Sequence, residues 1–84
     1  MIYRWFLKSP KYSEWILAGE YSSWEQFDKE FRNKIVMQYN FNGLNILHGR
    51  DMANNILAAV KKYGNGLCVE DPNTKVEYSF EIID

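Results

Sequence analysis

The chain has 84 residues, 17% of them aromatic and 25% charged, with a formal net charge of −1 at pH 7. This length fits one small domain and excludes a buried catalytic cavity beside a complete hydrophobic core. The single cysteine, Cys68, excludes an internal disulfide and a multi-cysteine metal site, and the balanced charge argues against a strongly basic nucleic-acid binder.

The first predicted element is a strand at residues 2–8, a short run dense in β-branched and aromatic residues. Residues 9–20 then allow two interpretations. A Ser-Pro pair at the start and a glycine at the end could delimit a short helix. Alternatively, residues 9–13 form a turn and residues 14–21 form a second strand that pairs with the first. We favour this hairpin, because its apolar residues lead directly into a strong helix start.

The strongest helix signal is the sequence Ser-Ser-Trp-Glu-Gln. Ser22 with Glu25, or Ser23 with Gln26, can form a capping box, in which the hydroxyl accepts a free backbone N–H and the acid or amide reaches back. We therefore expect a helix over residues 23–38. The apolar residues of its inner stripe recur at helical spacing: Trp24, Phe27, Phe31 and Ile35.

A second helix is expected after a break at residues 40–43, whose Asn and Gly residues tolerate left-handed backbone. Residues 44–47 are interpreted as a short extended piece. Asp51 is then predicted to be the N-cap of the second helix and Gly64 its C′ residue. The predicted inner face of this helix consists of Met52, Ile56, Ala59, Val60 and Tyr63.

Two further strands are expected at residues 67–70 and 75–83, with a turn at residues 71–74 between them. Apolar and polar residues alternate along the last strand, which predicts one buried face and one wet face. The expected element order is therefore ββααββ. We predict one α+β domain, residues 1–84, in which an N-terminal and a C-terminal hairpin form a small antiparallel sheet with two helices packed on one face.

The densest polar cluster of the sequence is His48, Arg50 and Asp51, which we expect in the loop before the second helix. Such a cluster could bind an anion, or support proton transfer with His48 as the base. However, Asp51 is already interpreted as a helix cap, and no nucleophile lies at a recognisable spacing. Cys68 stands between apolar residues and next to acidic ones, which is typical of an unreactive thiol. We therefore expect no catalytic residue, no metal site and no cofactor.

The layout of charge along the chain is more informative. Residues 65–84 contain five acidic side chains against one lysine, whereas residues 1–64 contain nine basic and six acidic side chains. This asymmetry could merely keep the protein soluble, but it also fits a partner with a basic surface. We therefore predict a small non-catalytic protein-binding module, an inhibitor or adaptor that occludes a basic, nucleic-acid-handling surface of a larger target. Its predicted partner contacts are Glu70, Asp71, Glu77 and Glu81.

The alternative is a protein that binds RNA or single-stranded DNA, because such proteins stack bases on exposed aromatic rings within a basic groove. The N-terminal part of the chain carries both residue types, but no RNP-like or GXXG signature is present. The candidate nucleic-acid or anion contacts are Trp5, Trp15, Lys8, Lys11, His48 and Arg50.

No segment approaches the roughly 20 apolar residues of a membrane span, and residues 1–8 are too short and too charged for a signal-peptide core. With the lone cysteine, which is typical of a reducing compartment, this predicts a soluble cytoplasmic protein without a membrane partner. The frequent Phe, Tyr, Met, Ile, Asn and Lys are typical of AT-rich genomes, including those of many phages, and suggest an anti-defence role. Exposed strand edges leave a monomer and a homodimer equally open.

Overall fold

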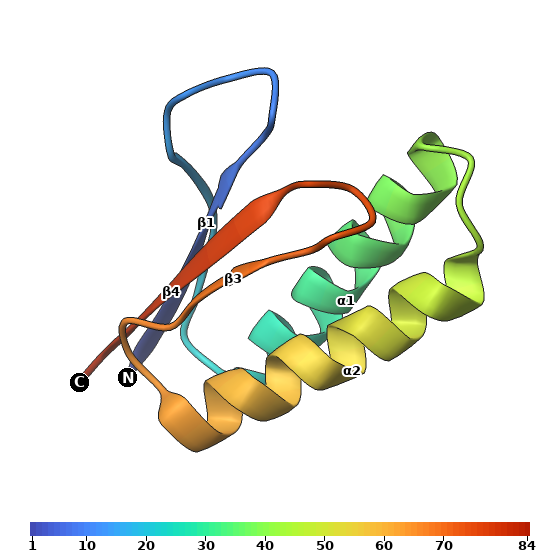
Figure 1. Cartoon of the computed structure of the whole chain (residues 1–84). Coiled ribbons are helices and arrows are strands. Elements are labelled where there is room, and N and C mark those ends of the chain that lie inside the picture. The colour runs from blue at the N-terminus through green and yellow to red at the C-terminus, as the bar shows by residue number, and fades with distance from the viewer.

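A computed structural model describes all residues, 1–84, and has two helices packed on one face of a four-stranded antiparallel sheet (Figure 1). The α+β class and the order ββααββ are confirmed. The strands are arranged β2-β1-β4-β3, so that β1 and β4 are central. We call the face turned away from the helices the open sheet face. The elements are β1 (Ile2–Lys8), β2 (Ile16–Tyr21), α1 (Trp24–Phe41), α2 (Ile46–Tyr63), β3 (Cys68–Glu70) and β4 (Glu77–Ile83).

The N-terminal hairpin interpretation is confirmed, because β1 pairs with β2 in antiparallel register. A bulge between Trp5 and Phe6 leaves Ala18 without a partner and brings Gly19 opposite Trp5. A Cβ atom on Gly19 would lie 2.5 Å from the Trp5 indole nitrogen and 2.2 Å from the Tyr21 hydroxyl. The glycine is therefore required by close packing inside a strand, and it does not end a helix.

Helix α1 begins where the capping signal predicted. Ser23 is the N-cap, and its Oγ accepts a hydrogen bond from the backbone N–H of Gln26 at 3.2 Å. The helix extends to Phe41, three residues beyond the expected end, and Asn42 closes it by donating its backbone N–H to the carbonyl of Gln38. The residues of α1 that are buried against the sheet and α2 are Phe27, Phe31, Ile35 and Tyr39.

The predicted start of the second helix is wrong. Helix α2 begins at Ile46 with Asn45 as N-cap, whose side-chain oxygen accepts the backbone N–H of Leu47 at 2.9 Å. Asp51 therefore lies inside the helix, and residues 44–47 are not an extended piece. The misleading signal is Asp51 itself, a typical N-cap residue. Gly49 lies within the helix and permits close contact with α1, because a Cβ there would lie 2.9 Å from the Tyr39 ring.

The inner face of α2 also differs in part from the prediction. Ala53 and Leu57 are buried and were not expected, whereas Tyr63 was expected inside and is 66% exposed. Gly64 follows the helix with a positive φ of 71°, as expected for its C′ position. The C-terminal hairpin is also present, although both of its strands are shorter than predicted.

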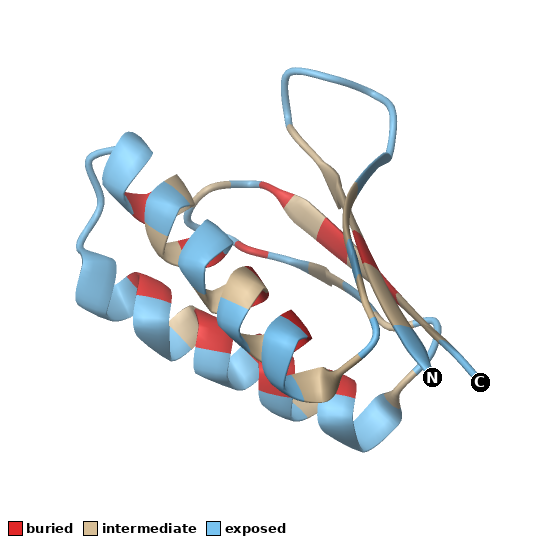
Figure 2. Cartoon of the chain, turned by 180° about the vertical axis from the view of Figure 1, so that it is seen from behind, coloured by how far each residue is buried: buried red, intermediate tan, exposed pale blue.

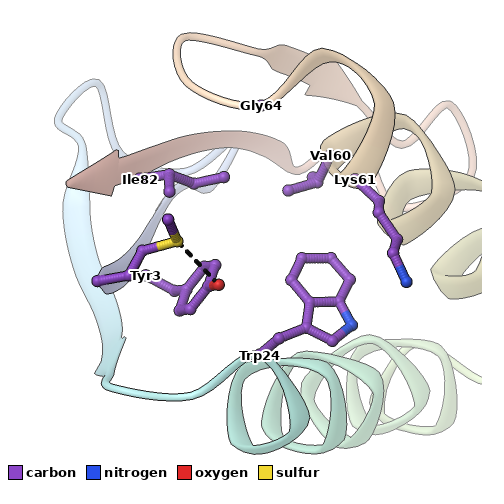
Figure 3. Close-up of a pocket in the computed structure, with 7 residues that line it drawn as sticks. Tyr3, Trp24, Val60, Lys61, Gly64 and Ile82 are labelled. Carbon is purple, nitrogen blue, oxygen red and sulfur yellow. Dashed lines mark hydrogen bonds between the residues drawn. The ribbon is translucent and has the colours of Figure 1, made fainter. Parts of the chain in front are cut away.

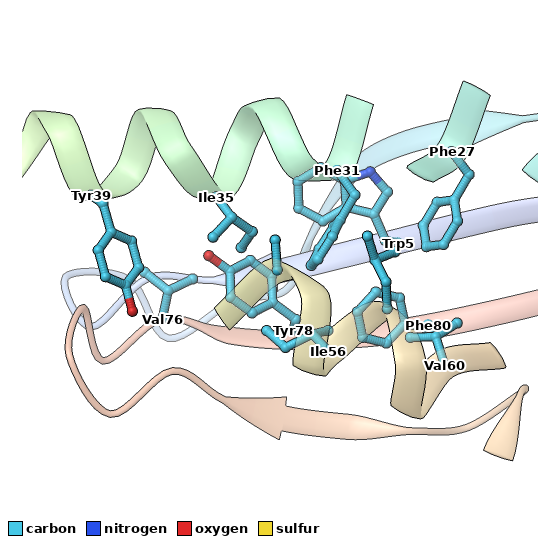
Figure 4. Packing of buried hydrophobic residues seen from close by; sticks show 12 residues of the cluster. Trp5, Phe27, Phe31, Ile35, Tyr39, Ile56, Val60, Val76, Tyr78 and Phe80 are labelled. Atoms are coloured by element: carbon cyan, nitrogen blue, oxygen red, sulfur yellow. The ribbon is translucent and has the colours of Figure 1, made fainter. Parts of the chain in front are cut away.

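The hydrophobic core fills the space between the sheet and the two helices (Figure 2). Aromatic rings dominate it and meet largely edge to face, as in the pair Trp5 and Phe31, whose ring centroids are 5.0 Å apart (Figure 4). The buried hydrophobic residues are Trp5, Phe27, Phe31, Ile35, Tyr39, Ala53, Ile56, Leu57, Val60, Val76, Tyr78 and Phe80.

Candidate functional site

The open sheet face carries rows of charged side chains that cross the central strands. Arg4 lies between Glu20 on β2 and Glu81 on β4, directly opposite both in the strand register. It donates hydrogen bonds to both carboxylates, with 3.3 Å between its Nη1 and the Glu81 oxygen. These bonds, first to Glu20 and then to Glu81, raise the pKa of Arg4 above its usual value. Arg4 is therefore a fixed cation that joins three strands.

A second charged row lies further along the same face. The Lys8 ammonium is 3.6 Å from a carboxylate oxygen of Glu77. Glu77 in turn stands opposite Glu70 on β3, and Glu70 forms no ion pair. Lys8 thus pairs with Glu77, and Glu70 has no basic partner. The charged residues of the open sheet face within the strands are Arg4, Lys8, Glu20, Glu70, Glu77 and Glu81, so its formal net charge is −2.

The sequence-predicted acidic contacts are only partly brought together. Glu70, Glu77 and Glu81 share the open sheet face, but Glu81 is paired with Arg4 and Glu77 with Lys8. Lys8, a candidate nucleic-acid contact, therefore lies on the same face as the predicted acidic contacts.

Asp71 has to be removed from the predicted partner contacts, because its side chain is fully buried. One carboxylate oxygen accepts the Tyr39 hydroxyl at 3.0 Å and the backbone N–H of Asn73 at 2.9 Å. The Asn73 amide also donates to the Tyr39 hydroxyl at 2.9 Å. Asp71 therefore ties the β3–β4 turn to α1 and cannot contact a partner.

Two polar atoms of this buried cluster have no hydrogen-bond partner: the second carboxylate oxygen of Asp71 and the hydroxyl of Tyr78. Burial, and to a smaller extent the charge of Asp71, raises the pKa of Tyr78 far above its usual value. Burial also raises the pKa of Tyr39. Both tyrosines stay protonated at neutral pH and serve the packing of the turn.

Trp5 also has to be removed, from the predicted nucleic-acid contacts. Its ring is fully buried among core aromatic residues and cannot stack on a base. Trp15 and Lys11 do remain accessible on the hairpin connection, residues 9–15, which projects beyond the sheet (Figure 1). Trp15 is 42% exposed, and the Lys8 ammonium lies 5.8 Å from its ring centroid.

His48 and Arg50 do not form the expected loop cluster. Both are exposed residues of the first turns of α2, in the helical layer on the other side of the sheet from the open face. They therefore do not join Trp15, Lys8 and Lys11 in one surface.

A feature that sequence reasoning missed is an apolar row between the two charged rows. Leu17 on β2 stands opposite Phe6 on β1, which stands opposite Ser79 on β4, which stands opposite Cys68 on β3. Leu17 is 52% exposed, Phe6 is half-buried and the Cys68 thiol is exposed. The only sequence signal for this row is the alternation of side chains along a strand, which places Phe6 on the opposite face from Trp5.

A pocket of about 440 Å³ opens at the end of the molecule where β1 begins and β4 ends (Figure 3). It lies on the helix-covered side of the sheet and is mainly apolar. Its walls are formed by Met1, Tyr3, Trp24, Val60, Lys61, Gly64 and Ile82.

No group of three or more His, Cys, Asp or Glu side chains is arranged to hold a metal ion. Neither helix is long and apolar enough to cross a membrane. Comparison of the chain with protein-family models, with curated proteins and with solved structures gives no match.

Proposed function

We propose that the protein is a small non-catalytic protein-binding module whose open sheet face docks on a basic surface of a larger partner. The observation that carries this proposal is the cross-strand pair Glu70 and Glu77, two like charges directly opposite each other, of which only Glu77 forms an ion pair, with Lys8. Like charges in this position destabilise a sheet. A lysine or arginine from a partner would relieve this repulsion. Binding of such a partner would therefore also stabilise the sheet locally.

The distribution of charge over the two layers supports the choice of this face. The open sheet face has a formal charge of −2, whereas the two helices carry six basic and four acidic side chains. A partner with a basic surface is therefore attracted to the sheet and turned away from the helices. Such complementarity increases association rates and fixes orientation.

The apolar row supplies the contact area that charges alone do not. Leu17 is substantially exposed and stands opposite the half-buried Phe6, and the exposed Trp15 ring lies next to the Lys8 side chain of the same face. Exposed aromatic residues within a patch rimmed by charge are typical anchors of protein interfaces. Phe6, Leu17 and Trp15 are the apolar anchors of the proposed interface, and Glu70 and Glu77 its acidic contacts.

The acidic charge of the open sheet face also suggests which ligand the basic surface of the partner normally binds. Protein surfaces that bind phosphate backbones are rich in lysine and arginine. A small acidic face docked on such a surface would occlude it, and the protein would act as an inhibitor or adaptor of a nucleic-acid-handling protein.

The experiment is affinity capture with the tagged full chain from source cells, with nuclease present, followed by mass spectrometry. The wild type is compared with the double variant Glu70→Lys/Glu77→Lys. The matched control is Glu25→Lys/Glu30→Lys, which changes the net charge equally but on α1. Thermal melts establish that all three proteins are folded.

We expect one stoichiometric protein partner for the wild type and the control, and its loss for the Glu70/Glu77 variant. Retention of the partner by both double variants would contradict the proposed interface. Captured material that disappears with nuclease would instead favour the nucleic-acid alternative, with Trp15 and Lys11 as the residues to test next.

A further inference from the structure

The pocket at the end of the sheet is lined by the ends of four elements. Tyr3 comes from β1, Ile82 from β4, Trp24 from the first turn of α1, and Val60 and Lys61 from the last turn of α2 (Figure 3). Tyr3 and Ile82 both belong to the inner face of the sheet. The pocket is therefore separate from the open sheet face.

One wall of the pocket is formed by the end of α2. Gly64 ends the helix with a φ of 71° and lines the pocket, and a Cβ atom there would have no heavy atom beyond its chain neighbours within 4 Å. At about 440 Å³ the volume lies within the range of roughly 300–1,000 Å³ that is typical of small-molecule sites. The space can accept a molecule of one ring or a short alkyl chain.

The walls define the chemistry of an occupant. The Trp24 ring is half-buried and meets the Tyr3 ring edge to face, with 5.8 Å between their centroids. The Lys61 ammonium lies 5.6 Å from the Trp24 ring centroid, at the side of the pocket. No acidic residue lines the pocket, and the Tyr3 hydroxyl is directed to the sulfur of Met1 at 3.0 Å. Apolar walls with the Lys61 ammonium at their side and no carboxylate select an apolar body that carries one negative charge.

We infer that this pocket binds a small organic anion with an aryl or alkyl body, such as an aromatic or aliphatic carboxylate. The apolar body contacts Trp24, Tyr3 and Ile82, and the carboxylate pairs with the Lys61 ammonium. Binding orders Lys61 over the pocket and shields the Trp24 ring from water. This site does not depend on the proposed protein interface, because no residue is shared between them.

The test uses two probes of the same shape, 4-phenylbutyrate and the uncharged 4-phenylbutanol, titrated into the ¹⁵N-labelled full chain and followed by NMR. The three tryptophans give three indole N–H signals. We expect the Trp24 signal and the Gly64 amide to shift, and those of Trp5 and Trp15 to stay in place. A ligand of about twelve heavy atoms should bind with a Kd in the millimolar range.

Two lysine variants then test the role of the cation. Lys61→Gln should weaken 4-phenylbutyrate roughly two- to fivefold, as expected for a solvent-exposed ion pair, and leave 4-phenylbutanol unchanged. Lys62→Gln is the matched control, because Lys62 does not line the pocket and lies instead over the Tyr63 ring. Both residues are exposed, so both variants should fold.

Three results would overturn the inference. The first is the absence of a Trp24 shift at about ten times the expected Kd. The second is equal affinity of the wild type for the acid and the alcohol. The third is an equal loss of acid binding in Lys61→Gln and Lys62→Gln.

Discussion

The two faces of the sheet differ sharply in how deeply their side chains are buried. On the inner face Trp5, Tyr78 and Phe80 are at most 1% exposed and are surrounded by aromatic rings. Their neighbours along the same strands, such as Phe6 and Glu77, are half-buried on the open face. Adjacent residues of one strand thus serve different purposes: one stabilises the fold, and the next is available for recognition.

This difference has an energetic consequence. A chain of 84 residues has a total stability of about 4–12 kcal/mol, so the inner face cannot be altered without risk to folding. The open face has no helix over it, and its ion pairs are partly exposed to solvent. We therefore expect substitutions on the inner face to lower stability, and those on the open face to change binding instead.

The largest expected effect on stability comes from a comparison of two adjacent residues of β1 that belong to opposite faces of the sheet. Trp5→Ala removes the fully buried indole and should cost about 3–5 kcal/mol in the free energy of unfolding. Phe6→Ala, one residue further along on the open face, should cost about 1 kcal/mol. Urea denaturation of both variants measures the two values, and equal losses would show that the faces do not differ as described.

A second comparison lies within the buried polar cluster. Tyr39→Phe removes the hydroxyl that bonds Asp71 and Asn73 and should cost about 1–3 kcal/mol. Tyr78→Phe removes a hydroxyl without a partner and should change stability by less than about 0.5 kcal/mol. Chemical denaturation tests the pair. A cost for Tyr78→Phe as large as that for Tyr39→Phe would reveal a bond at the Tyr78 hydroxyl.

The same tyrosines predict a dependence of stability on alkaline pH. Burial raises the pKa of Tyr78 above its value in the unfolded chain. The protonated tyrosine therefore contributes fully to the free energy of unfolding below about pH 10, and this contribution is lost as the pH rises further. Each such tyrosine contributes up to about 1.4 kcal/mol per pH unit. Denaturation midpoints between about pH 8 and pH 12 should fall less steeply for Tyr78→Phe than for the wild type. Parallel curves would contradict this.

On the open sheet face, the smallest expected effect on stability comes from Lys8→Gln, which should also change binding. Loss of this partly exposed ion pair with Glu77 should cost less than about 1 kcal/mol. It also removes the cation that pairs with Glu77, so affinity for a basic partner should rise roughly two- to fivefold. Titration calorimetry with the captured partner measures this, with Lys29→Gln on α1 as the control. Weaker binding by Lys8→Gln would contradict the proposed orientation.

The parts of the fold that could be predicted are those that depend on residues close together in the sequence. The serine cap at Ser23, the helical stripe of α1 and the alternation along β4 are local patterns, and the structure confirms them. The start of α2 was missed because Asp51 is as typical an N-cap residue as Asn45, which is the N-cap in the structure.

The candidate site was less predictable, because it depends on residues from different elements. Asp71 resembles any acidic turn residue, and only the Tyr39 hydroxyl from another element shows that it points inward. Trp5 and Phe6 lie in one apolar run, so the sequence did not indicate which of them faces the helices. Pairing of Arg4 and Lys8 with acidic residues depends on the β1–β4 register, which joins residues from the two ends of the chain.

The most direct test of the account uses the single cysteine of the chain as a reporter. Cys68 is exposed on the open sheet face, in the apolar row that contains Phe6. Its reaction with Ellman's reagent is measured for the free protein and at saturating concentrations of the captured partner, and the signal of the partner alone is subtracted. A small free thiol with the same concentration of partner, in a separate reaction, is the control. We expect the partner to slow the reaction of Cys68 at least several-fold and to leave that of the free thiol unchanged. An unchanged rate for Cys68 in the complex would show that the partner binds elsewhere and would contradict the assignment of the open sheet face.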